Sequence, residues 1–145
     1  MKVAKIFVRF FAINILFILL AITFHELGHS VFSLALGCKA KAVIFDTANP
    51  FPYSEIYCTN FSPLIYLGGL IFVLPLPFLV SWLMNEDFRL SGIGLSFLMA
   101  SHDLSLLLGV FIEPFIFVSF IVSFLGEVKT INFSVNQVFK NIDLK

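Results

Sequence analysis

The chain has 145 residues, of which 59% are hydrophobic and only 12% are charged, and its formal net charge is zero. A soluble globular domain carries about 25% charged residues, so this composition excludes an ordinary water-soluble globule and predicts a single domain, residues 1–145, embedded in a lipid bilayer. With no basic stripe in the sequence, nucleic acid is not expected as a partner.

The first predicted element is a long apolar helix that begins after three basic residues, Lys2, Lys5 and Arg9. No charged residue follows until position 26, and the apolar character resumes after His29 as far as Gly37. Residues 10–36 make about 40 Å of helix at 1.5 Å per residue, which is enough to cross a bilayer with some tilt. Gly37 is placed where a helix C-cap glycine is expected.

The stretch after this helix has the pattern of short strands. Residues 39–45 and 53–59 are rich in β-forming residues and flank a turn-rich link at 46–52, so we expect a β-hairpin or a re-entrant loop. Cys38 and Cys58 bracket the link. We expect two free thiols, with a disulfide as the alternative if this segment faces an oxidising compartment.

Three further apolar runs complete the chain. Residues 61–84 contain Gly68, Gly69, Pro75 and Pro77, which predict a broken or kinked helix, and a polar turn is expected over residues 85–89. Residues 90–108 form a third run, and residues 110–125 form a fourth, shorter one. The sequence thus predicts an α-helical integral membrane protein with three to four transmembrane helices and a small hairpin between the first two.

Within this fold we expect a core at residues 10–108, a fourth span or re-entrant segment at 109–126 and a tail at 127–145. With four spans, seven basic residues lie on the side of the termini, and only Lys39 and Lys41 lie on the other. Basic residues favour the cytoplasmic side, so the charges place both termini in the cytoplasm of a multi-pass protein, which we expect in the cell membrane.

One motif carries chemistry: His25, Glu26 and His29 form an H-E-x-x-H sequence inside the first predicted helix. Residues four apart share a helix face, so both imidazoles can bind one metal ion, here Zn²⁺. Zinc lowers the pKa of a bound water to about 7, and Glu26 is placed to accept its proton. Polar groups within an apolar span are functional by default, whereas two histidines merely hydrogen-bonded to neighbouring helices would leave Glu26 unexplained.

A third metal ligand is expected from His102, Asp103 or Glu113. We favour Asp103, because an unpaired carboxylate at this depth costs about 2.5–3.5 kcal/mol, and because its distance from the end of its helix matches that of the two histidines. His102 lies about 100° away around the same helix, so it is the alternative ligand or a residue that supports the site from outside the metal. Glu113 precedes a proline and fits an interfacial position better.

The order of these features resembles the site-2 protease family of intramembrane zinc metalloproteases. The resemblance covers residues 10–108: the H-E-x-x-H helix, the glycine and strand that follow it, the hairpin, a glycine-containing second helix and Asp103 in the third. It implies that His25, His29 and Asp103 bind zinc and that Glu26 is the general base. It also implies a transmembrane segment of another protein as substrate, unwound and added as a strand to the hairpin. In that family the His-Glu helix runs from outside toward the cytoplasm, opposite to the direction that the charges predict.

The competing interpretation is a non-catalytic binding or regulatory membrane protein on the same scaffold. A di-iron hydroxylase is excluded because the chain has only three histidines, and a prenyl-protein protease would need Glu113 as a ligand. The sequence predicts neither the oligomeric state nor the residues that bind substrate.

Overall fold

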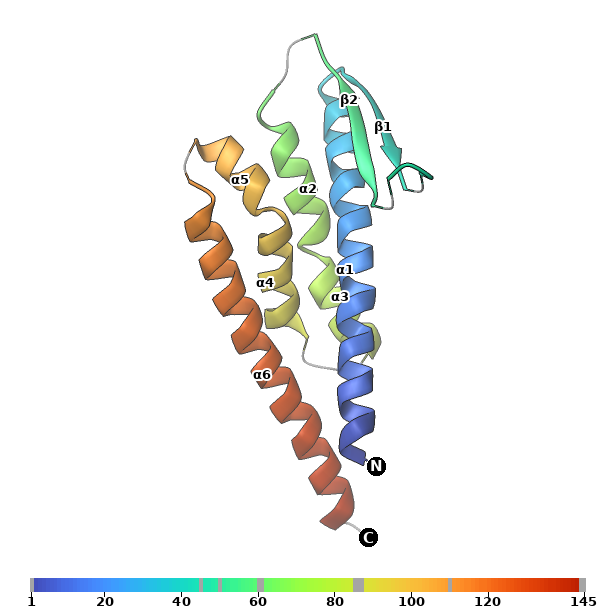
Figure 1. Cartoon of the computed structure of the whole chain (residues 1–145), viewed down its shortest axis with the longest axis vertical. Coiled ribbons are helices and arrows are strands. Elements are labelled where there is room, and N and C mark those ends of the chain that lie inside the picture. Colours follow the sequence, from blue (N-terminus) through green and yellow to red (C-terminus); the bar gives the residue numbers. More distant parts are fainter. Residues whose placement is uncertain are drawn as a thin grey trace.

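The computed structural model describes residues 2–44, 46–49, 51–59, 62–84, 88–109 and 111–143. Six helices and one two-stranded sheet follow one another in the order α1, β1, β2, α2, α3, α4, α5, α6. Figure 1 shows the helices side by side, with the two termini at one end of the molecule and the hairpin at the other. Most of the polar turn expected at 85–89, and the first residues of the runs expected at 61 and 110, lie outside the described residues.

Helix α1, Lys2–Ala35, contains the whole first apolar run and the basic residues before it. The main chain leaves the helix at Gly37, whose φ of 80° lies in the left-handed region that glycine enters at little cost. There the Cys38 N–H donates to the carbonyl of Ser33, and the Gly37 N–H donates to that of Leu34. These bonds satisfy carbonyls that the end of a helix leaves open, and the predicted helix end is confirmed.

Strands β1, Lys39–Val43, and β2, Tyr53–Tyr57, pair antiparallel, with Lys39 opposite Tyr57 and Val43 opposite Tyr53. Of the two predicted alternatives, the β-hairpin is the one that forms. Cys38 and Cys58, just outside the two strands, are joined by a disulfide. The expectation of two free thiols is therefore wrong: the pairing register places the cysteines opposite each other, with Cα atoms 4.7 Å apart.

The broken second helix is confirmed as α2, Ile65–Val73, and α3, Leu76–Met84. The break falls at Leu74 and Pro75, as expected from the missing N–H of proline.

The third run is also broken, which the sequence did not predict. Helix α4, Arg89–Met99, and helix α5, Ser101–Leu108, meet at Ala100 with a bend of 55°. The Ser101 hydroxyl donates to the carbonyl of Leu98, so a side chain competes with the helical ladder at the bend.

Helix α6, Glu113–Asp143, follows the left-handed Gly109. It is one continuous helix of 31 residues. It runs through the segment expected as a fourth span or re-entrant stretch and into the expected tail, and its part Glu113–Asn132 is a candidate membrane span.

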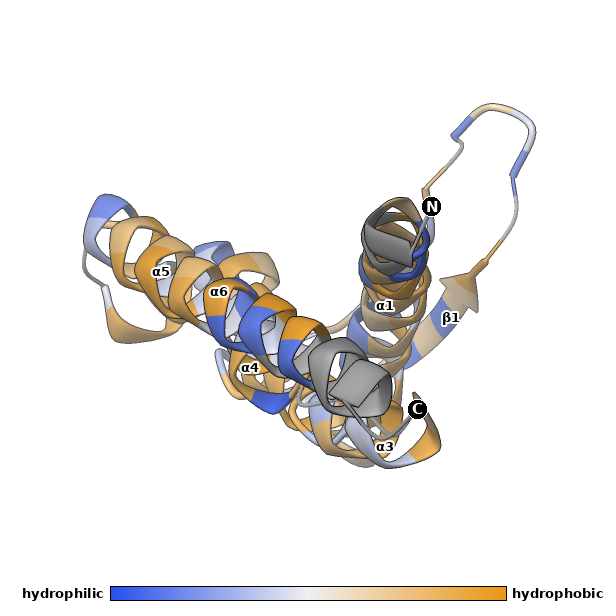
Figure 2. Cartoon of the chain, turned by 90° about the horizontal axis from the view of Figure 1, so that it is seen from below, coloured by the Kyte–Doolittle hydropathy of each residue, from blue (hydrophilic) through white to orange (hydrophobic). Residues whose placement is uncertain are grey.

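Among the residues that the structure describes, three helical stretches are long and apolar enough to cross a membrane: Val8–Ala35, Ile65–Met84 and Glu113–Asn132. The bent pair α4 and α5 makes a fourth if it counts as one span. Figure 2 shows many hydrophobic residues along the helical ribbons, with hydrophilic residues between them. Large apolar side chains such as Phe11, Trp82 and Phe120 are 61–77% exposed on the outside.

The buried core lies between α1, α3 and the start of α4. It centres on the rings of Phe17 and Phe88, which meet edge to face with centroids 5.0 Å apart. Both rings are almost completely buried. This packing fixes α1 against the helices that follow the hairpin, and the polar site described next lies on the same face of α1, two turns closer to the hairpin.

Candidate metal centre

Two imidazoles from α1 and one carboxylate from α5 converge beside α2, which contacts both helices. The Nε2 atoms of His25 and His29 lie 2.8 and 3.0 Å from the Oδ2 atom of Asp103, and 3.1 Å from each other. All three residues are at most 9% exposed. Ligands about 2.0–2.1 Å from a tetrahedral zinc ion lie about 3.3 Å from one another, so this triangle is close to the size that a shared ion requires.

The helices bring these side chains together for local reasons. His25 and His29 are one turn apart on α1 and present their rings on the face that packs against α2. Asp103 lies in the first turn of α5, directly after the bend at Ala100. The bend turns α5 off the axis of α4, as Figure 1 shows, and α5 remains in contact with α2.

A backbone carbonyl fixes the proton of one imidazole. The Nδ1 atom of His29 lies 2.9 Å from the carbonyl oxygen of Ile65, and a carbonyl can only accept. Nδ1 therefore carries the hydrogen, and Nε2 keeps a lone pair directed at Asp103 and His25. A metal-binding histidine is usually oriented in this way, by a hydrogen bond from its other ring nitrogen.

The remaining polar atoms of the cluster lack ordinary partners. Within the described part of the chain, His25 Nδ1 and Asp103 Oδ2 are buried without a hydrogen-bond partner, although Oδ2 lies close to both Nε2 atoms. Buried polar atoms are paired in the great majority of cases. Two imidazole nitrogens and one carboxylate oxygen directed at a common centre have the donor set and arrangement that suit a divalent cation.

Two glycines on α2 make room for the cluster. A side chain on Gly68 would overlap the backbone of Gly28, so α1 and α2 touch there through their main chains. A Cβ atom on Gly69 would lie 2.5 Å from the His25 ring and 2.8 Å from Nε2 of His29. From the sequence, this glycine pair indicated only a break or kink in the helix. In the structure, Gly69 also packs directly against both imidazole rings.

Comparison with protein-family models, curated proteins and solved structures found no match.

Glu26 lies beside the cluster and is half-buried. Its backbone carbonyl accepts a 2.6 Å hydrogen bond from the hydroxyl of Ser54 on β2, and the hydroxyl of Ser30 donates to that of Ser54 at 3.2 Å. The hairpin is therefore tied to α1 at the residue that follows the first histidine. Sequence reasoning missed Ser54, because nothing in the local pattern of β2 distinguishes it from an ordinary strand residue.

The other predicted candidates lie elsewhere. His102 is exposed although it is adjacent to Asp103, as the 100° step around a helix predicts. Glu113 is exposed at the start of α6. Of the His, Cys, Asp and Glu side chains in the described ranges, His25, His29 and Asp103 form the single group whose ligand atoms lie within 4.8 Å of one another.

Proposed function

We propose that this chain is an intramembrane zinc metalloendopeptidase of the site-2 protease type. The observation that carries the proposal is the convergence of two imidazole nitrogens and one carboxylate oxygen at separations of 2.8–3.1 Å. Two histidines and one carboxylate are a ligand set of catalytic zinc sites, which keep one position open for water or substrate. Zinc rather than calcium or magnesium suits a site with two imidazole nitrogens.

Membrane insertion is part of the proposal. The candidate spans expose large apolar side chains on their outer faces. Exposure of these side chains to water is unfavourable, whereas exposure to the hydrocarbon of a bilayer is not. The cluster itself lies within α1 and α5, away from the apolar exterior. Polar groups at such a depth are expected to face the interior of the bundle and to serve a function.

The chemistry assigned to the residues is peptide hydrolysis. His25, His29 and Asp103 would hold the zinc ion, which supplies a water of lowered pKa and polarises the substrate carbonyl. Glu26 accepts a proton from the water while the water oxygen bonds to the carbonyl carbon of the substrate. The C–N bond then breaks, and Glu26 delivers that proton to the leaving amine nitrogen. One water is consumed, and a carboxylate and an ammonium group are released, because the new carboxylic acid passes its proton to the amine.

The proposed substrate is a transmembrane or membrane-adjacent segment of another protein. A helical peptide bond is shielded by its neighbours, so the segment must unwind before a water can attack it. An unwound segment exposes backbone groups that need partners, and the free edge of the hairpin can supply them by strand addition. The hydrogen bond from Ser54 to Glu26 holds that hairpin beside the reacting groups.

The decisive experiment compares the wild type with Glu26→Gln, both purified in detergent and loaded with zinc. We expect equal zinc content, cleavage of at least one member of a panel of transmembrane substrates by the wild type, and none by the variant. Glu113→Gln is the matched control, since it removes an exposed carboxylate far along the chain, and it should cleave as the wild type does. Zinc bound by both proteins with no cleavage over a broad panel would instead indicate a binding or regulatory protein.

A further inference from the structure

Most of the basic residues that the structure describes lie toward the end of the molecule opposite the hairpin. Arg9 donates a 2.9 Å hydrogen bond to the carbonyl of Met84, so the start of α1 and the end of α3 lie at the same level. Arg89 begins α4 directly after that connection, and Lys129 lies 16 residues along α6, about 24 Å from its start near the opposite end. Of the basic residues in the described ranges, Lys39 and Lys41 lie at the hairpin end, on β1.

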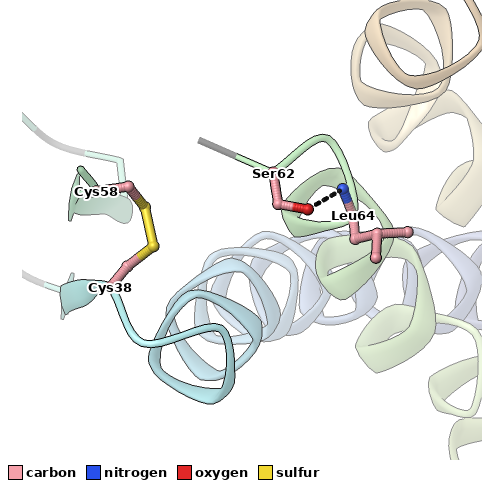
Figure 3. The surroundings of a disulfide bond; sticks show 4 residues. All are labelled: Cys38, Cys58, Ser62 and Leu64. Carbon is pink, nitrogen blue, oxygen red and sulfur yellow. Dashed lines mark hydrogen bonds between the residues drawn. A yellow bond between two sulfur atoms is a disulfide. The ribbon is translucent and has the colours of Figure 1, made fainter. Parts of the chain in front are cut away.

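The hairpin end of the molecule contains a disulfide bond. Cys38 and Cys58 are joined by a disulfide immediately after α1, and Figure 3 shows this bond beside the segment where Ser62 accepts a hydrogen bond from the Leu64 N–H at the entry to α2. Disulfides persist in oxidising compartments and are rare where the cytosol keeps thiols reduced. Basic residues in short loops favour the cytoplasmic side. The disulfide and the charges are independent observations, and both place the hairpin outside and the termini inside.

The metal ligands lie in the half of the helices nearer the hairpin. His29 and His25 are six and ten residues before the end of α1, which is about 9 and 15 Å along the axis. Asp103 is five residues before the end of α5, about 7.5 Å. The Ser54 hydroxyl reaches Glu26 from the hairpin, so the strands adjoin the cluster from this side.

From these positions we propose that the chain lies with both termini in the cytoplasm and acts on peptide bonds in the outer half of its substrate's transmembrane segment, the half next to the oxidising compartment. The proposed cleavage position rests on the proposed function, whereas the proposed orientation does not. The substrate class is a membrane protein whose span unwinds at its outer end, so that the freed strand reaches the hairpin edge without crossing the bilayer centre.

The orientation can be measured without any activity. Both cysteines of the chain form the disulfide, so one added cysteine is the only free thiol, and the bond itself stays intact. Lys41→Cys places it on the exposed hairpin, and Asn136→Cys places it on the exposed side of the last turns of α6. In intact cells a membrane-impermeant maleimide should label Lys41→Cys, and it should label Asn136→Cys only after permeabilisation. The reverse pattern would overturn the orientation.

The position of cleavage is tested with one transmembrane substrate in two versions. In one version an Asn-Pro pair unwinds the outer half of the span, and in the other it unwinds the inner half. Zinc-loaded wild type in vesicles should cleave the outer version at least tenfold faster. Equal rates, or faster cleavage of the inner version, would overturn the substrate assignment. No cleavage of either version, or of the wider panel, would overturn the proposed function itself, while the labelling result would still decide the orientation.

Discussion

A single methyl group added to Gly69 should remove the metal while leaving the fold in place. The added carbon would lie 2.5 Å from Cε1 and Nδ1 of His25 and 2.8 Å from Nε2 of His29. Carbon atoms in contact settle about 3.5–4.0 Å apart, so the rings must retreat by about 1 Å. Metal sites tolerate ligand displacements of only about 0.2 Å.

Loss of a group that merely orients a ligand costs about 10- to 100-fold in metal affinity, and here two ligands themselves must move. We therefore expect the Kd of Gly69→Ala for zinc to rise by about 100-fold or more. The atoms that the methyl meets are the ends of movable side chains rather than backbone, so the thermal unfolding midpoint in detergent should change little.

The assay is zinc titration with a competing chelator, followed by circular dichroism on the same samples. Ile71→Ala is the matched control, because it alters an exposed residue two positions later on α2 and should bind zinc as the wild type does. Gly28→Ala should behave differently again, since its methyl meets the backbone of α2 and forces the helices apart, which lowers stability and zinc binding together. Full zinc affinity in Gly69→Ala would refute the assignment of these rings as ligands.

Three further predictions concern the third ligand and the hairpin. Asp103→Ala should reduce zinc occupancy by at least tenfold while His102→Ala leaves it unchanged, as measured by metal analysis of the purified proteins; the opposite ranking would transfer the ligand role to His102. Ser54→Ala removes a hydrogen bond worth about 1 kcal/mol, so KM should rise about fivefold with kcat and zinc content unchanged, and Ser54→Thr should restore it. Hydrogen bonds from the Ala48 N–H and the Tyr53 hydroxyl lower the pKa of Asp46. The hydrogen bonds therefore stabilise the hairpin at pH values above the ordinary aspartate pKa of about 3.9. This stabilisation is lost as the pH falls below that pKa and the carboxylate is protonated. The protection of the β2 amides, measured relative to their intrinsic exchange rates at each pH, should therefore fall in acid for the wild type and stay constant in this range for Asp46→Asn. A wild type whose protection does not fall in acid would contradict the linkage.

The sequence predicted the outline of the fold because its signals are local. Gly37 ends α1, Pro75 breaks the second apolar run, and the spacing of β-forming residues on either side of the link predicts a hairpin. It did not predict the disulfide, because the pairing of Cys38 with Cys58 depends on the strand register rather than on either cysteine's neighbours. Nor did it predict the bend at Ala100, which arises where side-chain hydroxyls compete with helical hydrogen bonds.

For the site, helical geometry was sufficient to group His25 with His29 and to separate Asp103 from His102. The choice of Asp103 came from depth along two helices, and the structure brings the three side chains together. Three contacts of the site come from segments 24 to 44 residues after the α1 residues that they touch. They are the carbonyl of Ile65, the close packing of Gly69 and the hydroxyl of Ser54. Such contacts depend on how the helices and the hairpin pack, and a single sequence carries no local signal for them.

The central claim is that two imidazoles and one carboxylate hold a zinc ion, and X-ray absorption at the zinc edge of the purified, zinc-loaded protein tests it most directly. We predict an inner shell of nitrogen and oxygen at about 2.0–2.2 Å, with the outer-shell scattering of two imidazole rings, and loss of that imidazole signal in His25→Ala/His29→Ala. A shell containing sulfur at about 2.3 Å, or an unchanged spectrum in the double variant, would contradict the account.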